Sequence, residues 1–231
     1  MNRVTWIIFG AVIVLVLGGL VAYSRITNPS IDVSSVDLSK VIEASDQNGQ
    51  IADHTFGKTD SKVVLVEYGD FQCPSCGKAH PQIKAITEEY KDQILFIFRN
   101  LPLTSIHPNA RAAAAVVEAA GLQGRYWEMH NLVFESQSEW SNADSTKRTE
   151  IFTEYAVQLA LDKNKFLADL ENESVKKKIS FDEALFKKSG YEKSTPTFVL
   201  NGTKLNDETA GKVVNGSTTE LKALLDKAIN Q

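Results

Sequence analysis

The two cysteines of this 231-residue chain lie in the sequence Cys73-Pro74-Ser75-Cys76, and the chain has no others. A deprotonated cysteine is a nucleophile that attacks the sulfur of a disulfide, and the resulting mixed disulfide is resolved by a second thiol. Two thiols at this spacing can therefore perform a complete exchange. We predict that Cys73 is the nucleophile, that Cys76 is the resolving thiol, and that the two form one intramolecular disulfide.

The residues around the cysteines predict a strand that leads directly into a helix. The run over residues 63–66 is apolar and mostly β-branched, which is typical of a strand buried on both faces of a parallel sheet. After Cys76, apolar residues recur at helical spacing, and Pro74 suits a first helical turn, where a missing N–H costs little. Cys73 would then lie at the helix N-terminus, where unpaired N–H groups and the helix dipole stabilise a thiolate.

Two other positions could assist this chemistry. Glu67 lies six residues before Cys73, inside the predicted strand, where an unpaired carboxylate would be costly and would tend to take up a proton. Far downstream, the sequence Thr-Pro-Thr at 195–197 precedes a second apolar run over residues 198–200. That run, the Asn-Gly pair at 201–202 and the residues after it predict a β-hairpin with a type I′ turn.

From about residue 53 to the C-terminus, the chain resembles the thioredoxin superfamily, and within it the DsbA-like thiol:disulfide oxidoreductases. In that family a Cys-x-x-Cys pair caps a helix, an acid six residues upstream relays protons, and a cis-proline faces the disulfide. The resemblance implies that Glu67 is the proton relay and that Pro196 is the cis-proline. It implies further that Pro81 kinks the active-site helix.

The same resemblance implies a way to bind substrate. Thr195, next to the cis-proline, would hold an extended substrate segment by backbone hydrogen bonds, as in strand addition. We assign Pro74 and Ser75, between the cysteines, to the same substrate-binding surface.

The fold class implied is α/β: a thioredoxin fold with a helical insertion, preceded by an N-terminal transmembrane helix. Helical stripes of apolar residues run from Ser105 to Gly190, and we place the insertion at about 104–190. We assign residues 1–25 to a membrane anchor, 26–46 to a polar tether and 47–231 to the DsbA-like domain.

The anchor prediction rests on the uncharged, mostly apolar run from Trp6 to Tyr23. As a helix it would span roughly 27 Å, close to the ~30 Å thickness of a hydrocarbon core. A cleaved signal peptide is the alternative, because residues 22–24 place small side chains at the cleavage positions. The apolar run exceeds the usual signal-peptide core, which favours the anchor.

Two other roles for the cysteines are weaker. A structural disulfide that closes so short a loop would restrain little chain entropy. A zinc site that includes His80 would need four ligands, and no second Cys/His pair follows at ligand spacing. We therefore expect no metal and no cofactor.

Composition excludes other classes. The net charge of −4, from 25 basic and 29 acidic residues, gives no sign of a nucleic-acid surface. We expect His107 and His130 to be structural, and the lysine run 176–178 to be a solvated helix face.

These features predict a membrane-anchored, monomeric protein dithiol:disulfide oxidoreductase whose catalytic domain lies outside the cytoplasm, where disulfides persist. Its substrates would be exported proteins, and the resemblance implies a membrane partner that reoxidises the cysteines. The alternatives are a reductase of the same fold, or a peptide-binding, chaperone-like module with an incidental disulfide.

Overall fold

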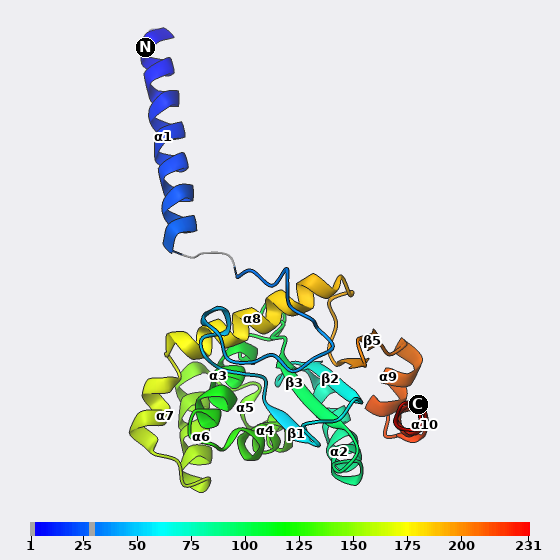
Figure 1. The fold of residues 1–231 in the computed structure, drawn as a ribbon. Helices are drawn as coiled ribbons and strands as arrows, with labels where there is room; N and C mark the ends of the chain where they lie inside the picture. The colour runs from blue at the N-terminus through cyan, green and yellow to red at the C-terminus, as the bar shows by residue number, and fades with distance from the viewer. Residues whose placement is uncertain (1–2, 28–30) are drawn as a thin grey trace. The chain divides into compact units, whose positions relative to one another are not determined.

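The chain divides into two units, residues 1–32 and Val33–Gln231. This computed structural model describes residues 3–27 and 31–231 (Figure 1). The first unit contains α1 (Arg3–Thr27), whose apolar side chains, such as those of Trp6 and Leu15, are exposed. Within the described residues, no helix combines the length and hydropathy needed to cross a membrane. Residues 28–30 of the predicted tether lie outside the described residues.

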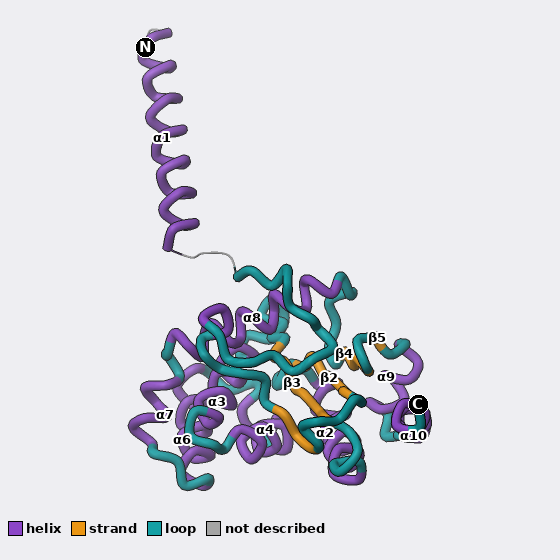
Figure 2. Tube along the Cα trace, viewed as in Figure 1, coloured by secondary structure: helices purple, strands orange, loops and turns teal. Residues whose placement is uncertain are grey.

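A five-stranded sheet forms the centre of the second unit, with helices around it (Figure 2). In spatial order its strands are β1 (Thr55–Gly57), β3 (Leu95–Asn100), β2 (Val64–Gly69), β4 (Thr197–Leu200) and β5 (Thr203–Lys204). The β2–β3 pair is parallel and the other pairs are antiparallel. Every residue of β2 and β3 is buried, as their apolar sequences predict.

The turn between β4 and β5 has the predicted hairpin geometry. Asn201 and Gly202 both have positive φ angles, 48° and 80°, as a type I′ turn requires. Asn201 also fixes the neighbouring strand, because its side-chain oxygen accepts a 2.8 Å hydrogen bond from the N–H of Val64.

Helices account for most of the remaining chain. Between β3 and β4 they are α3 (Ala110–Gly121), α4 (Tyr126–Glu135), α5 (Gln137–Trp140), α6 (Ser145–Gln158), α7 (Lys163–Asp169) and α8 (Glu173–Ser189). The others are η1 (Asp46–Asn48), α2 (Pro74–Glu89), α9 (Asp207–Val214) and α10 (Thr219–Ile229). This is a thioredoxin-like α/β fold with a helical segment inserted between two strands.

Different helices pack on the two faces of the sheet. The ring of Tyr68 in β2 packs against Phe186 of α8, with 5.2 Å between centroids. Because side chains alternate along a strand, the preceding residue, Glu67, faces the opposite side. Figure 1 shows α8 and α2 on opposite sides of the strands. Glu67 therefore lies on the face that α2 and its cysteines cover.

A buried ionic cluster occupies the α8 side of the sheet. Arg99 Nη2 lies 2.7 Å from Asp53 Oδ2. Lys178 Nζ bridges two carboxylates, at 3.1 Å from Asp53 Oδ1 and 2.7 Å from Asp182 Oδ1. All four side chains are at most 1 % exposed. The prediction that residues 176–178 form a solvated face was therefore wrong for Lys178, because α8 turns this one lysine towards the sheet.

Two cationic side chains, one of them from this cluster, bind the backbone at the start of the second unit. Arg99 donates to the backbone carbonyls of Leu38 and Lys40 at 2.9 and 2.8 Å, and Lys188 donates to those of Val33, Ser34 and Val36. These bonds attach residues 33–40 to the domain. The compact unit thus begins at Val33, within the predicted tether of residues 26–46.

Candidate active site

Cys73 and Cys76 lie at the junction of β2 and α2. Cys73 is the N-cap of α2, with extended backbone angles (φ −67°, ψ 123°), and Pro74 occupies the first helical position. Both cysteines are free thiols, so the structure represents the reduced form of the pair. Cys73 is 7 % exposed and Cys76 is fully buried. Of the two, only Cys73 can be approached from solvent.

The surroundings of Cys73 favour its thiolate. As a thiol, Cys73 donates from Sγ to the carbonyl oxygen of Thr195 at 3.4 Å, and the thiolate loses this bond. Its other contacts favour the thiolate. A hydrogen bond from the Cys76 thiol lowers the pKa of Cys73 to about 5, in spite of burial, which acts the other way. Further bonds from the backbone N–H groups of Cys76 and Ser75 lower it as well. These N–H groups belong to the first turn of α2, which stabilises an anion as predicted.

Cys76 has the opposite electrostatic environment. Burial raises its pKa well above the ordinary thiol value, and the charges of Cys73 and Glu67 raise it further. The main opposing contribution is a hydrogen bond from the backbone N–H of Asp70. The pair is therefore asymmetric, since one sulfur is stable as a thiolate and its neighbour retains its proton.

Glu67 provides a proton-carrying group on the same side of the sheet. It is 3 % exposed and lies between Phe98 of β3 and Phe198 of β4 in the strand register. Burial, together with the negative charge of Cys73, raises the pKa of Glu67 to about 8. At neutral pH the side chain is thus mainly a neutral acid that can donate a proton.

The loop that faces the cysteines comes from far along the chain. The Thr195–Pro196 peptide bond is cis, and Thr197 pairs with Tyr68 at the start of β4. The Thr195 hydroxyl oxygen is buried and has no hydrogen-bond partner within the part of the chain that is described. Pro74 is exposed and Ser75 half-buried, so the predicted substrate-binding residues lie at or near the surface around Cys73.

Sequence reasoning missed the residues that hold the cysteine loop in place. Asp70 is buried, and its Oδ1 accepts the N–H of Gln72 at 2.8 Å. Its Oδ2 accepts the N–H of Leu103 at 2.9 Å and lies 2.6 Å from Nδ1 of His107. Its carbonyl accepts the N–H of Cys73 at 3.0 Å. The only available signal was the acidic residue close to the cysteines, and its partners could not be found by spacing.

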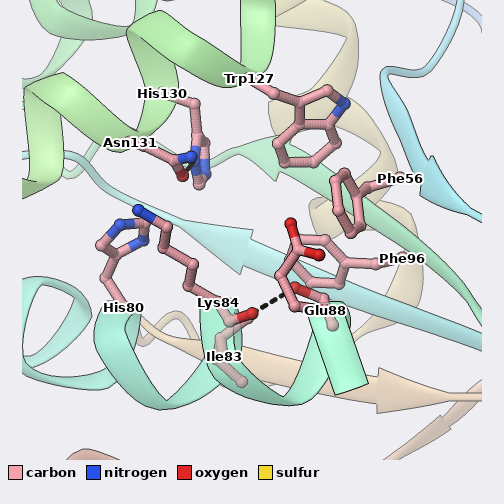
Figure 3. Close-up of a pocket in the computed structure, with 10 residues that line it drawn as sticks. Phe56, His80, Ile83, Lys84, Glu88, Phe96, Trp127, His130 and Asn131 are labelled. Atoms are coloured by element: carbon pink, nitrogen blue, oxygen red, sulfur yellow. Dashed lines mark hydrogen bonds between the residues drawn. The ribbon is translucent and has the colours of Figure 1, made fainter. Parts of the chain in front are cut away.

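A small pocket lies beside α2, lined by side chains of α2, α4, β1 and β3 (Figure 3). It has a volume of about 30 Å³, and His80 and His130 are among its lining residues. Both rings are buried, and within the described ranges Nε2 of each lacks a hydrogen-bond partner. Burial lowers the pKa of His80 to about 4 and that of His130 well below its usual value. Both imidazoles are therefore neutral bases near pH 7.

Comparisons with known proteins agree with this fold. The profile of a family described as Thioredoxin matches residues 50–226. The solved structure of oxidised BdbD from Bacillus subtilis has a TM-score of 0.65 at 21% identity, covering 83% of this chain and 98% of BdbD. The structure of alpha-DsbA1 from Wolbachia pipientis has a TM-score of 0.64 at 22% identity, covering 77% and 91%.

Curated relatives carry a different name. A Na(+)/H(+) antiporter NhaA 1 from Salinispora arenicola is 39% identical over 153 residues, which are 65% of this chain. A second antiporter, NhaA 3 from Salinispora tropica, is 37% identical over 150 residues. The chain spans only 22% of the length of either relative.

Proposed function

Because this chain belongs to the thioredoxin family and has a DsbA-like fold, we propose that it is a thiol:disulfide oxidoreductase that introduces disulfides into exported proteins. The observation that supports this most directly is the asymmetric cysteine pair. Cys73 retains 7 % exposure and its pKa is lowered to about 5, whereas Cys76 is fully buried and its pKa is raised. An exchange catalyst needs one thiolate that reacts and leaves readily, and one thiol protected from outside attack.

The reaction starts from the Cys73–Cys76 disulfide. A substrate thiolate attacks Sγ of Cys73, the bond to Cys76 breaks, and Cys76 leaves with the electron pair. Glu67, a neutral acid near pH 7, donates a proton to this buried thiolate, whose pKa is the higher of the two. A second substrate thiolate then attacks the substrate sulfur of the mixed disulfide. Cys73 leaves as a thiolate, the substrate has lost two electrons, and the cysteine pair has gained them.

The low pKa of Cys73 favours oxidation of the substrate. It stabilises the reduced form, so the disulfide becomes the stronger oxidant. A pKa two units below pH 7 corresponds to about 60 mV in a two-electron couple, at roughly 30 mV per unit. We therefore expect a potential more positive than about −200 mV. A redox titration of the full chain against glutathione that gives a value near −270 mV would favour the reductase instead.

The substrate would bind as an extended segment across Thr195 and Pro196, with Pro74 and Ser75 beside it. We propose further that a membrane protein reoxidises the cysteines. In this proposal α1 anchors the catalytic domain on the extracytoplasmic side, supported by the exposed apolar side chains of that helix. Release of the protein by carbonate extraction, or a mature N-terminus near residue 25 in mass spectrometry, would contradict the anchor.

Trapping of covalent complexes tests the roles of the cysteines. In the Cys76→Ser variant, the neighbouring thiol that can attack Sγ of Cys73 and release a bound substrate is absent, so mixed disulfides between Cys73 and substrate proteins should accumulate on non-reducing gels. The Cys73→Ser variant should trap few adducts, because Cys76 is fully buried. Equal trapping by the two variants would contradict the assignment. Peptide binding without any exchange by the wild-type protein would favour the chaperone-like alternative.

A further inference from the structure

The side chain of Gln137 contacts the backbone on both sides of the nucleophile. Gln137 is the first residue of α5, in the helical insertion. Its Nε2 donates to the carbonyl of Phe71 at 2.7 Å and to the carbonyl of Cys73 at 3.0 Å. One amide group from a distant part of the sequence therefore joins the residue two before the nucleophile to the nucleophile itself.

Both carbonyls belong to buried residues, Phe71 at 1 % and Cys73 at 7 % exposure. The Cys73 carbonyl also accepts the N–H of Gly77 at 3.1 Å, the first bond of the α2 ladder. A buried carbonyl that loses its donor is destabilised unless the backbone moves to find another partner. Without Gln137, we expect the loop before α2 to shift and to carry the Cys73 sulfur away from the N–H groups that stabilise its thiolate.

Gly77 gives an independent indication that this contact matters. A Cβ atom at position 77 would lie 2.6 Å from Oε1 of Gln137, so any larger residue would displace the amide group. Glycine within a helix costs roughly 1 kcal/mol relative to alanine. Gly77 lies in α2 directly after Cys76, where this cost is offset if the space is needed for Gln137.

The backbone around Gln137 is held in place by buried contacts and hydrogen bonds. Trp140, in the same turn, is fully buried and donates from its indole N–H to the carbonyl of Val133 at 2.9 Å. The N–H of Ser141 donates to the Gln137 carbonyl at 3.0 Å, and the Ser141 carbonyl accepts from the side chain of Gln72 at 2.6 Å. The insertion thus presents Gln137 to the cysteine loop from a fixed backbone.

We propose that Gln137 is a positioning residue for thiol exchange: by holding the carbonyls of Phe71 and Cys73 it keeps the nucleophilic sulfur at the start of α2, and Gly77 provides the space it needs. The part of this inference that concerns the rate of thiol exchange rests on the proposed function. The position of the thiolate, in contrast, can be measured without any substrate.

The test uses two variants of the full chain that remove the same contact from opposite sides. Gln137→Ala deletes the amide, and Gly77→Ala displaces it while leaving residue 137 intact. In each, the thiolate fraction at the wild-type midpoint pH, followed by ultraviolet absorbance, should fall about fivefold, as a rise of one unit in the pKa of Cys73 requires. Turnover at saturating peptide dithiol should fall about tenfold with little change in KM.

Because both variants break one contact, the double variant should be no worse than either single variant. Gly211→Ala is the matched glycine control, since Gly211 lies in α9 with open space around its Cβ position. Gln158→Ala, at an exposed position of α6, is the matched glutamine control. Both controls should keep the wild-type titration and turnover.

Two results would overturn the proposal: an unchanged thiolate titration in Gln137→Ala, or a Gly77→Ala variant that is more stable but titrates like the wild type. If the wild-type protein oxidises no peptide, the proposed function fails, but the titrations still decide the role of Gln137. A fivefold effect in both single variants, without further loss in the double variant, supports the proposal.

Discussion

Glu67 and Asp53 are both buried carboxyl groups next to the central sheet, yet their pKa values move in opposite directions. Glu67, on the side of the cysteines, has no cation beside it among the described residues, and burial with the charge of Cys73 raises its pKa to about 8. Burial would also raise the pKa of Asp53, but the charges of Lys178 and Arg99 outweigh it and lower that pKa to about 2. The same residue chemistry thus gives a neutral acid at one site and a permanent anion at the other.

The difference in pKa gives the two carboxyl groups different roles within one domain, proton transfer for Glu67 and structural pairing for Asp53. A carboxyl group that is buried without a cation can exchange its proton near neutral pH, and this is what a thiol exchange site requires. A carboxylate that is paired with two cations is fixed in charge and position. Arg99, paired with Asp53, therefore helps to hold residues 38–40 on the domain, while Glu67 remains available for proton transfer.

The largest effect should come from removing a cation that pairs with Asp53. Lys178→Met leaves the carboxylates of Asp53 and Asp182 buried without their shared cation, and we expect a loss of roughly 3–5 kcal/mol in the free energy of unfolding. Lys177→Met, at the exposed neighbouring position, should change it by less than about 0.5 kcal/mol. Urea denaturation of the two variants measures both values. Similar stabilities would show that the cluster does not hold the fold together.

Glu67→Gln tests the unpaired side, where we expect a loss of rate rather than of stability. Without the neutral acid, the leaving Cys76 thiolate is protonated more slowly. We therefore expect the rate of exchange to fall by roughly a hundredfold near pH 7. The folded-state pKa of Glu67 is raised from 4.5 to about 8, so its contribution to stability is present below pH 4.5 and is lost as pH rises towards 8. The variant should lack this decline. Wild-type rates at every pH would remove Glu67 from the mechanism.

A smaller effect should come from His80, a buried base of α2, the helix that covers the Glu67 side of the sheet. Its pKa falls from 6.5 to about 4 in the folded state, so its contribution to stability is present above pH 6.5 and is lost as pH falls through 4. His80→Phe should retain roughly 2 kcal/mol more of its stability than the wild type when both are taken from pH 7 to about pH 4.5. Equal losses in thermal unfolding at the two pH values would show that this ring is not the acid-sensitive group.

Much of the reactive centre could be predicted from short stretches of sequence. The two cysteines, the proline at the first helical turn and Glu67 lie within ten residues, so one strand and one helix determine how they are arranged. The buried strands and the Asn-Gly hairpin were predictable for the same reason, because alternation and turn chemistry are local properties. The thioredoxin-like fold with its helical insertion followed from these signals and the family resemblance.

Contacts between distant segments decided the remainder. Sequence could not distinguish Lys178 from its exposed neighbours, because the carboxylate of Asp53 that pairs with it comes from a segment 125 residues earlier. Gln137 reaches Cys73 across 64 residues, and nothing in the pattern around it marks a functional side chain. The spacing of residues along one strand or helix fixes which side chains share a face. Which of these faces come into contact depends on how the helices and strands pack in the tertiary structure. That packing determined the charge of each buried group and the contacts that position Cys73.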